Sequence, residues 1–270
     1  MVLKDFGYDG EKLSDYGFMP CVINSDGTID FGSTLKFNTV KTGCTGINRL
    51  VSSEYENVCT ATFDVCKNPC KFENFGITDI ELRQLSRWLN KRQYKKFKPV
   101  YENGEFDDLY FLGSFNLTPI SVGTNIVGIT LAFTSNAPYG YGETGTMEYT
   151  IENTDGFFYF SDTSDEMGFN YPSTVKITCA ASGDLKITND ADENHTVLIK
   201  NCKTNETITL DCVNEIITTN MSHAKLFNDF NYNYIRFYNE YDNTQNKFTV
   251  SLPCKISIDY SPIRKVGVIV

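Results

Sequence analysis

The sequence predicts a mainly β protein in which an N-terminal β-sandwich or sheet domain with one α-helix precedes a second β-sandwich domain. Short segments with alternating apolar side chains recur between turns rich in Asn, Asp and Gly, as is typical of β-sandwiches. Only one segment, at about residues 79–90, has apolar residues at helical spacing. Aromatic residues make up 14% of the chain, which suits half-buried sheet surfaces.

An interruption at Ala137–Gly142 divides the chain. The apolar strand predicted at Ile126–Phe133 runs into the sequence Ala-Pro-Tyr-Gly-Tyr-Gly. We expect this segment neither to continue a strand nor to start a helix, because proline lacks an amide donor and the two glycines leave the backbone permissive. The sequence therefore predicts two domains, at residues 1–138 and 139–270.

The helix before the interruption has a clear start and one apolar side. Thr78 and Glu81 have the spacing of a capping box. Leu85, Trp88 and Leu89 repeat at helical spacing, together with Leu82, and form one apolar stripe. We expect this stripe, which includes the only tryptophan of the chain, to pack on a sheet. Strands are predicted around the helix as a pair at Ile47–Glu54 and Val58–Cys66, and at Phe106–Ile120.

The other face of this helix and its exit are basic, and no acidic residue occurs between residues 82 and 101. The basic residues are Arg83, Arg87, Lys91, Arg92, Lys95, Lys96 and Lys98. One interpretation is an electrostatic contact with a negative partner, either nucleic acid or an acidic neighbouring subunit. The alternative is a solvated helix face whose cations complement the helix dipole near the C-terminus.

After the interruption the sequence predicts short strands at turn-separated intervals, which is the pattern of an all-β sandwich. They are expected at Val175–Ala180, Asp184–Asn189, Val197–Asn201, Thr207–Cys212, Tyr234–Tyr238, Phe248–Leu252 and Lys255–Tyr260.

Composition restricts the class of protein. Hydrophobic residues make up 41% of the 270 residues, which is enough for folded cores. The net charge of −10 at pH 7 argues against a general nucleic-acid binder. Residues 1–6 lack the apolar core of a signal peptide, and no run approaches the roughly 20 apolar residues of a spanning helix. We therefore expect folding in a cytosol, without a membrane contact.

The nine cysteines do not suggest a disulfide framework. Strand alternation places Cys59, Cys179, Cys212 and Cys254 on apolar faces, so we expect buried thiols that act as small hydrophobes. Cys59, Cys66 and Cys70 are candidates for part of a zinc site, but no CxxC pair or nearby histidine completes it. We predict no metal and no cofactor.

No pattern of catalytic residues is evident. The only histidines are His195 and His223, both expected in polar, turn-like surroundings. Neither a Gly-x-Ser-x-Gly elbow nor a phosphate-binding loop occurs. Because a hydrolase needs a positioned acid and base, we predict that the protein is not an enzyme and assign no catalytic residue.

The order of several short motifs resembles the distal tail proteins of phages with long, non-contractile tails, over nearly the whole chain. The N-terminal half carries Phe6-Gly7-Tyr8-Asp9-Gly10, Asp15-Tyr16-Gly17-Phe18, Leu85-Ser86-Arg87-Trp88-Leu89 and Ile129-Thr130-Leu131-Ala132-Phe133 before Ala137-Pro138-Tyr139. The C-terminal half carries Tyr171-Pro172, Leu185-Lys186-Ile187-Thr188-Asn189, Leu226-Phe227-Asn228-Asp229-Phe230-Asn231 and Ile258-Asp259-Tyr260-Ser261-Pro262-Ile263-Arg264-Lys265. One departure is Tyr232, where such proteins commonly have glycine.

The resemblance implies a structural protein of the virion. It implies a hexameric ring at the tail tip, built by the N-terminal domains around a channel through which DNA passes without specific binding. Galectin-like C-terminal domains would lie outside the ring. The expected partners are further copies of the chain, the tail tube protein, the tail-associated hub protein and receptor-binding proteins. The basic residues above are then the expected subunit or partner interface.

The alternative function is a carbohydrate-binding module that contacts host cell-wall polysaccharide. The second half offers Tyr232, Tyr234, Tyr238 and Tyr241 as rings on which sugars stack. A simpler explanation is that these aromatic residues fill both faces of a strand. A galectin-like fold by itself does not imply sugar binding, because folds and sites are separable.

Overall fold

The computed structural model describes residues 3–23, 34–41, 43, 46–102, 104, 106–240 and 244–266. Its internal contacts divide the chain into two compact units, Met1–Tyr141 with Arg264–Val270 and Gly142–Ile263. The first unit holds one α-helix and the second is a β-sandwich, so the predicted mainly β fold class is confirmed. No helix in the described part of the chain is long and apolar enough to span a membrane.

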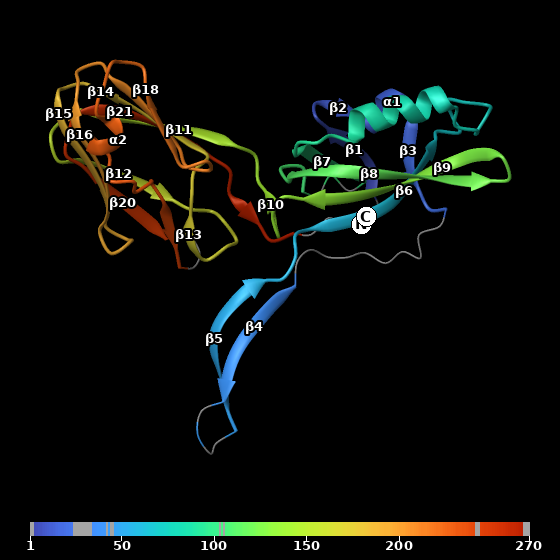
Figure 1. The fold of residues 1–270 in the computed structure, drawn as a ribbon, viewed down its shortest axis with the longest axis horizontal. Coiled ribbons are helices and arrows are strands. Elements are labelled where there is room, and N and C mark those ends of the chain that lie inside the picture. The colour runs from blue at the N-terminus through green and yellow to red at the C-terminus, as the bar shows by residue number, and fades with distance from the viewer. Residues whose placement is uncertain are drawn as a thin grey trace. The chain divides into compact units, whose positions relative to one another are not determined.

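The first unit contains a seven-stranded antiparallel sheet in the order β2-β1-β7-β8-β9-β6-β3. Its strands are β1 (Leu3–Tyr8), β2 (Glu11–Lys12), β3 (Phe18–Cys21), β6 (Thr60–Lys67), β7 (Lys95–Tyr101), β8 (Phe111–Val122) and β9 (Asn125–Ser135). A 3-10 helix, η1 (Leu13–Tyr16), precedes β3. Figure 1 shows the helix α1 (Asp79–Leu89) lying along one face of this sheet.

The capping box predicted at the start of α1 is confirmed. Thr78 Oγ1 accepts a hydrogen bond from the Glu81 N–H at 3.3 Å, and Glu81 Oε2 accepts one from the Thr78 N–H at 2.8 Å. Glu81 Oε1 also lies 2.8 Å from Lys67 Nζ, and the Lys67 side chain is only 7% exposed. This ion pair links the first turn of α1 to the last residue of β6.

The apolar stripe of α1 packs on the sheet, as predicted. Leu85, Trp88 and Leu89 are buried in the core of the unit. Trp88 Nε1 donates to the carbonyl oxygen of Tyr8 at 2.9 Å, and the Trp88 ring stacks on Phe6 with centroids 5.8 Å apart. A buried indole N–H thus has a partner, which a tryptophan in a core requires.

The strands β4 (Leu35–Lys41) and β5 (Asn48–Tyr55) form a separate two-stranded hairpin, which Figure 1 shows apart from the larger sheet. The predicted pairing of β5 with β6 is wrong, because β6 pairs with β3 and β9. The reason is burial: β6 is mostly buried in the core, whereas nearly every residue of β5 is exposed.

The predicted interruption contains a short strand after all. Gly140 and Tyr141 form β10 (Gly140–Tyr141), and the backbone of Tyr141 exchanges two hydrogen bonds of 2.8 Å with Tyr110. A side chain at residue 140 would meet Leu109 Cδ1 at 2.7 Å. Glycine therefore permits this pairing through close approach of the backbone, and the expectation of no strand fails here.

The predicted strand at Phe106–Ile120 begins later than expected, at Phe111. Phe106 has a φ of 59°, which is outside the extended region, and its carbonyl oxygen accepts a hydrogen bond from the Leu109 N–H at 2.9 Å. This turn replaces the first part of the predicted strand.

The second unit is a sandwich of two antiparallel sheets, ordered β11-β21-β14-β17-β18 and β12-β20-β15-β16. The strands of the first sheet are β11 (Gly145–Ile151), β14 (Thr174–Cys179), β17 (Thr207–Asp211), β18 (Ile216–Thr219) and β21 (Cys254–Tyr260). Those of the second sheet are β12 (Gly156–Ser161), β15 (Gly183–Asn189), β16 (His195–Cys202) and β20 (Gln245–Val250). The smaller elements are β13 (Gly168–Asn170), α2 (Leu226–Asp229), β19 (Phe237–Asn239) and β22 (Ile263–Arg264).

Alternate residues of both sheets point inward and form one core. Tyr149 of β11 and Phe158 of β12 join the two sheets, with ring centroids 4.3 Å apart. The sequence did not indicate β12, because its Phe157 and Tyr159 are exposed between buried aromatic residues and hide the alternation. It also missed β11, β13 and β18, and the strand predicted from Tyr234 begins only at Phe237.

The departure at Tyr232 has a structural meaning. Tyr232 has a φ of 57°, in the left-handed region that favours glycine. A non-glycine residue in this conformation costs roughly 1–2 kcal/mol. Residue 232 therefore has the left-handed backbone conformation that favours glycine, although it is a tyrosine.

Candidate assembly interface

The basic residues predicted as a partner contact lie on three different elements. Arg83 and Arg87 are exposed on α1, Lys91 and Arg92 follow the helix, and Lys95, Lys96 and Lys98 belong to β7. The expectation of one basic helix face and exit fails from residue 95 onward, because β7 pairs with β1 and β8. Strand alternation then turns Lys95 to the opposite side from Lys96 and Lys98.

Several of the lysines already interact within the chain. Lys91 Nζ lies 3.8 Å and Lys95 Nζ 3.3 Å from the Asp9 carboxylate. Lys96 Nζ lies 3.9 Å from the centre of the Tyr110 ring, in a cation–π contact. These lysines are therefore less available to a partner than the sequence suggested.

The three arginines differ from the lysines. Arg83, Arg87 and Arg92 are exposed, and none of them has an ion pair with a residue in the described ranges. A guanidinium is always charged and binds carboxylates in a bidentate manner. The arginines are consequently the basic groups that remain available for an acidic surface.

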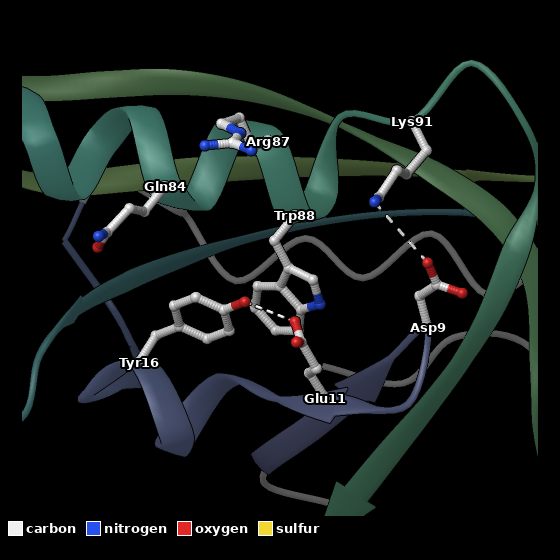
Figure 2. A pocket seen from close by; sticks show the side chains of 7 residues that line it. All are labelled: Asp9, Glu11, Tyr16, Gln84, Arg87, Trp88 and Lys91. Carbon is white, nitrogen blue, oxygen red and sulfur yellow. Dashed lines mark hydrogen bonds and ion pairs between the residues drawn. The ribbon is translucent and has the colours of Figure 1, made fainter.

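A hollow of about 420 Å³ lies between α1 and the segment from β1 to η1. Figure 2 shows Gln84, Arg87 and Trp88 on the helix side of this hollow. From the other side, Tyr16 donates a hydrogen bond to Glu11 Oε2 at 2.5 Å, and its ring stacks on Trp88. Burial and the nearby carboxylates raise the pKa of Tyr16 to about 12, so its hydroxyl stays protonated. The hollow has an aromatic wall and charges of both signs at its rim.

One face of the β4–β5 hairpin carries three large exposed apolar side chains among smaller polar ones. Residues opposite each other in an antiparallel pair share a face, and the register places Leu35, Phe37 and Leu50 together on one side. All three are exposed, with Phe37 and Leu50 each 59% accessible. An apolar sheet face left in water is unfavourable unless another surface covers it.

On the other face of the hairpin, polar side chains of β4 pair with polar side chains of β5. Lys36 Nζ pairs with Glu54 at 3.2 Å, and Asn38 Nδ2 donates to Ser52 Oγ at 3.1 Å. Between residues 38 and 39 the register shifts at a bulge, which increases the local twist. The ion pair and this hydrogen bond thus lie on the face opposite Leu35, Phe37 and Leu50, a face that also carries the exposed Val40.

Glu206, His223 and Asp229 form a hydrogen-bonded row that the sequence did not indicate. His223 Nδ1 lies 2.9 Å from Glu206 Oε1, and its Nε2 lies 3.1 Å from Asp229 Oδ2. Burial alone lowers the pKa of His223, but the two carboxylates outweigh this effect and raise it. Burial raises the pKa of Glu206, yet hydrogen bonds from Lys203, His223 and Thr219 lower it overall. Through His223, these hydrogen bonds connect Asp229 at the end of α2 with Glu206, which directly precedes β17.

This row was missed because its members are far apart in sequence and no spacing rule connects them. The histidine is in polar surroundings, as expected, but its side chain is only 4% exposed. Only the fold brings the three side chains together, and no local signal in the sequence reveals them.

The tyrosines considered for sugar stacking do not form one exposed group. Tyr234 is buried, with 8% of its surface accessible, so it is not available to a ligand. Tyr232 is exposed, Tyr238 is half-buried, and Tyr241 lies outside the described residues. Tyr234 is buried because its ring packs edge-on against Phe230 at 5.3 Å.

The thiols predicted on apolar faces are buried, as expected for Cys59, Cys179, Cys212 and Cys254. Burial raises the pKa of Cys212 and of Cys254 to about 12, so both stay as neutral thiols. Cys59 and Cys66 fall on opposite faces of the same strand run by alternation. Among the described residues, no group of three or more His, Cys, Asp or Glu is arranged to hold a metal ion.

Comparisons with known proteins agree with this architecture. Residues 1–137 match the family described as the phage tail protein N-terminal domain, and residues 139–260 match the phage tail C-terminal domain. No curated protein matches the sequence. Among solved structures, the chain is similar to the crystal structure of the phage SPP1 Dit protein, described as a paradigm of the hub adsorption apparatus in phages that infect Gram-positive bacteria.

The similarity to the SPP1 Dit protein extends over 97% of this chain and 99% of that chain, with a TM-score of 0.63. The sequence identity is 13%, so the likeness shows a common fold. The resemblance predicted from the short motifs is confirmed. Because the family match covers both units, the chain belongs to the phage tail proteins and is a component of the virion.

Proposed function

We propose that this tail protein forms a hexameric ring at the tail tip, which joins the tail tube protein to the hub protein and to the adsorption apparatus with its receptor-binding proteins. The observation that carries this proposal is the apolar face of the β4–β5 hairpin. A lone two-stranded hairpin is at best marginally stable in water. A second copy of the chain that covers this face would stabilise the hairpin and link the subunits.

A ring requires a heterologous contact, in which one patch of each subunit meets a different patch of the next. The hairpin provides one such patch, because Leu35, Phe37 and Leu50 lie on one side of it. Covering apolar surface contributes roughly 25 cal/mol for each Å² removed from water. Rotation of this contact around an axis then closes the assembly.

The exposed arginines Arg83, Arg87 and Arg92 complete the proposed contact. Their charges suit the acidic surface of a neighbouring subunit or tail protein, given the net charge of −10. Such contacts contribute orientation and speed of association more than affinity. Of the interface predicted from sequence, Lys91, Lys95, Lys96 and Lys98 are assigned a smaller part, since each of them interacts with other residues of the chain.

DNA passage is supported by the sheet face opposite α1. The middle strands of this face carry Thr62 and Asn116 on either side of Ala132, and Thr118 beside Thr130, which donates a hydrogen bond to the buried Asp64. A channel wall made of these central neutral side chains would not hold phosphates, provided that Lys96 and Lys98 of β7, which face the same side, lie away from the path of the DNA. Strong DNA binding with a steep salt dependence would contradict this part of the proposal. Catalysis has no part in it.

The ring is tested by removing the apolar face of the hairpin. Phe37→Ser combined with Leu50→Ser should reduce the assembly from six times the 30.6 kDa chain mass to one. Asn38→Ala with Ser52→Ala, on the polar face, is the matched control and should leave the assembly intact. Light scattering gives the mass, and negative-stain microscopy shows the ring.

Some rings close only on a neighbouring protein, so purified tails are examined as well. Cross-linking followed by mass spectrometry should join β4 or β5 of one copy to the N-terminal unit of another. A single-chain mass in solution together with no cross-link between copies in tails would refute the ring.

A further inference from the structure

The two outer faces of the C-terminal sandwich differ in chemistry. On the sheet β12-β20-β15-β16, Phe157 and Tyr159 point outward, with 55% and 45% of their surface accessible. The outward positions of the other sheet, as far as the structure describes it, carry Thr, Ser, Lys, Asp, Glu and Ile but no aromatic residue. Two exposed aromatic side chains on one face, with centroids 5.4 Å apart, call for a specific explanation.

The register places polar groups directly beside these rings. Phe157 lies opposite Thr249, which in turn lies opposite Thr188. Tyr159 lies opposite Lys247, whose carbonyl oxygen accepts the N–H of Asp190. Because adjacent strands are about 4.8 Å apart, each row spans about 10 Å from its aromatic ring to the third strand.

The polar part of this face is hollowed. A depression of about 230 Å³ is lined by Asp155, Lys186, Thr188, Asp190, Thr249 and Ser251. It is smaller than the pockets that enclose drug-sized ligands, which are roughly 300–1,000 Å³. Its size suits one polar ring resting on the surface, next to Thr249, which is the cross-strand neighbour of Phe157.

The charges of the face are balanced. Lys247 Nζ lies 3.4 Å from the Asp190 carboxylate and 5.3 Å from the centre of the Phe157 ring. Lys186 and Asp155 add one further charge of each sign. A balanced face does not attract a polyanion or a polycation, whereas its hydroxyls, carboxylates and ammonium groups suit a ligand rich in hydroxyl groups.

We propose that the outer face of the β12-β20-β15-β16 sheet binds a neutral oligosaccharide of the bacterial surface. The planes of Phe157 and Tyr159 are 70° apart, so each ring would stack on the apolar C–H side of a different sugar unit. Asp190, Lys186 and Lys247 exchange hydrogen bonds with its hydroxyl groups. The site goes beyond the proposed ring, since it needs only the folded sandwich, and it differs from the group of tyrosines around Tyr232.

The test uses the full chain on an array of neutral bacterial oligosaccharides, with polyglycerol phosphate and duplex DNA as anionic probes. Binding to at least one neutral glycan is expected, and isothermal titration then gives its affinity. Phe157→Ala and Tyr159→Ala should each weaken that affinity by about tenfold. Asp190→Asn should weaken it as well, because an acceptor for hydroxyl groups is changed.

The matched controls are Tyr232→Ala and Phe227→Ala, which remove equally exposed aromatic residues elsewhere on the sandwich. Both should retain wild-type affinity. All variants are compared by circular dichroism, since outward side chains contribute little to folding. The proposal is overturned if no neutral glycan binds at millimolar concentration, if only the anionic probes bind, or if Tyr232→Ala abolishes binding that Phe157→Ala leaves intact. Because the ring is not needed for any of these measurements, their failure leaves the proposed assembly untouched.

Discussion

The β4–β5 hairpin and the C-terminal sandwich are both antiparallel β-structure, yet they place their apolar side chains differently. In the sandwich, residues such as Ile177, Ile187 and Ile256 are fully or almost fully buried between two sheets. In the hairpin, Phe37 and Leu50 share a face that the rest of the described chain leaves exposed. Both segments have alternating patterns, but only one of them has a second layer.

Apolar residues therefore have two roles in this chain: stabilising the fold of the subunit and stabilising the assembly. In the sandwich they stabilise the fold of the subunit, because burial of apolar surface is complete within it. In the hairpin they are not expected to stabilise the isolated subunit, since no described residue of the subunit covers them. Their stabilising effect is expected only after assembly, which makes the hairpin the best place to separate assembly from folding.

The largest expected effect comes from truncating one side chain in each region. Ile177→Ala should lower the free energy of unfolding by about 2–5 kcal/mol, because it leaves a cavity in a closed core. Leu50→Ala should change it by no more than about 0.5 kcal/mol in the dissociated subunit. Urea unfolding at low protein concentration measures both. A large loss for Leu50→Ala would show that the hairpin is packed within the subunit.

The next effect concerns the ion pair that joins α1 to the seven-stranded sheet. Glu81→Gln keeps the capping box but leaves the ammonium of Lys67 buried without its counter-charge. The free energy of unfolding should fall by about 2–3 kcal/mol, somewhat less than for fully buried pairs, because Glu81 is partly exposed. Denaturation of the variant beside the wild type measures the loss, and an unchanged value would mean that the pair contributes nothing.

A smaller effect depends on pH and concerns the sandwich. The pKa of His223 is raised on folding, so its contribution is complete below the unfolded pKa of about 6.5 and is lost as pH rises through the folded pKa. The pKa values of Glu206 and Asp229 are lowered on folding. Their contributions are present above their unfolded pKa values of about 4 and are lost as pH falls below them.

His223→Gln should therefore lower the free energy of unfolding at pH 6 by about 1–2 kcal/mol, through the loss of hydrogen bonds to charged groups. The wild type should lose stability between pH 6 and pH 8, and the variant should lose less over the same interval. Unfolding curves at both pH values test this. Equal slopes for the two proteins would contradict the assignment of the titration to His223.

The smallest effect belongs to the polar face of the hairpin. Lys36→Met removes the ion pair with Glu54, whose partners are both more than half exposed. Because water screens such a pair, we expect no measurable change in stability or in assembly. Light scattering and denaturation check this, and loss of the ring would assign the polar face to the interface.

The sequence predicted the local features of the fold well. The capping box of Thr78 and Glu81 and the apolar stripe with Trp88 depend on residues within about two helical turns of each other. The alternation of Cys59 and Val65 correctly gave the buried face of β6. The strand β12 escaped prediction because aromatic residues occupy both of its faces.

The candidate site was predicted less well than the fold. The basic residues were read as one surface, although β7 carries three of them into a sheet and Asp9 pairs with two. The apolar side of the hairpin depends on the pairing of β4 with β5 and on a bulge, neither of which the sequence revealed.

The sequence by itself determined where apolar and polar side chains alternate and where the main helix begins, because these properties depend on neighbouring residues. Only the tertiary structure decided which strands pair, which charges meet and which apolar faces stay exposed. These features depend on contacts between residues that are distant in sequence, such as Glu206 with His223, or the row that contains Phe157 and Thr188. The periodicity of a sequence carries no information about such contacts.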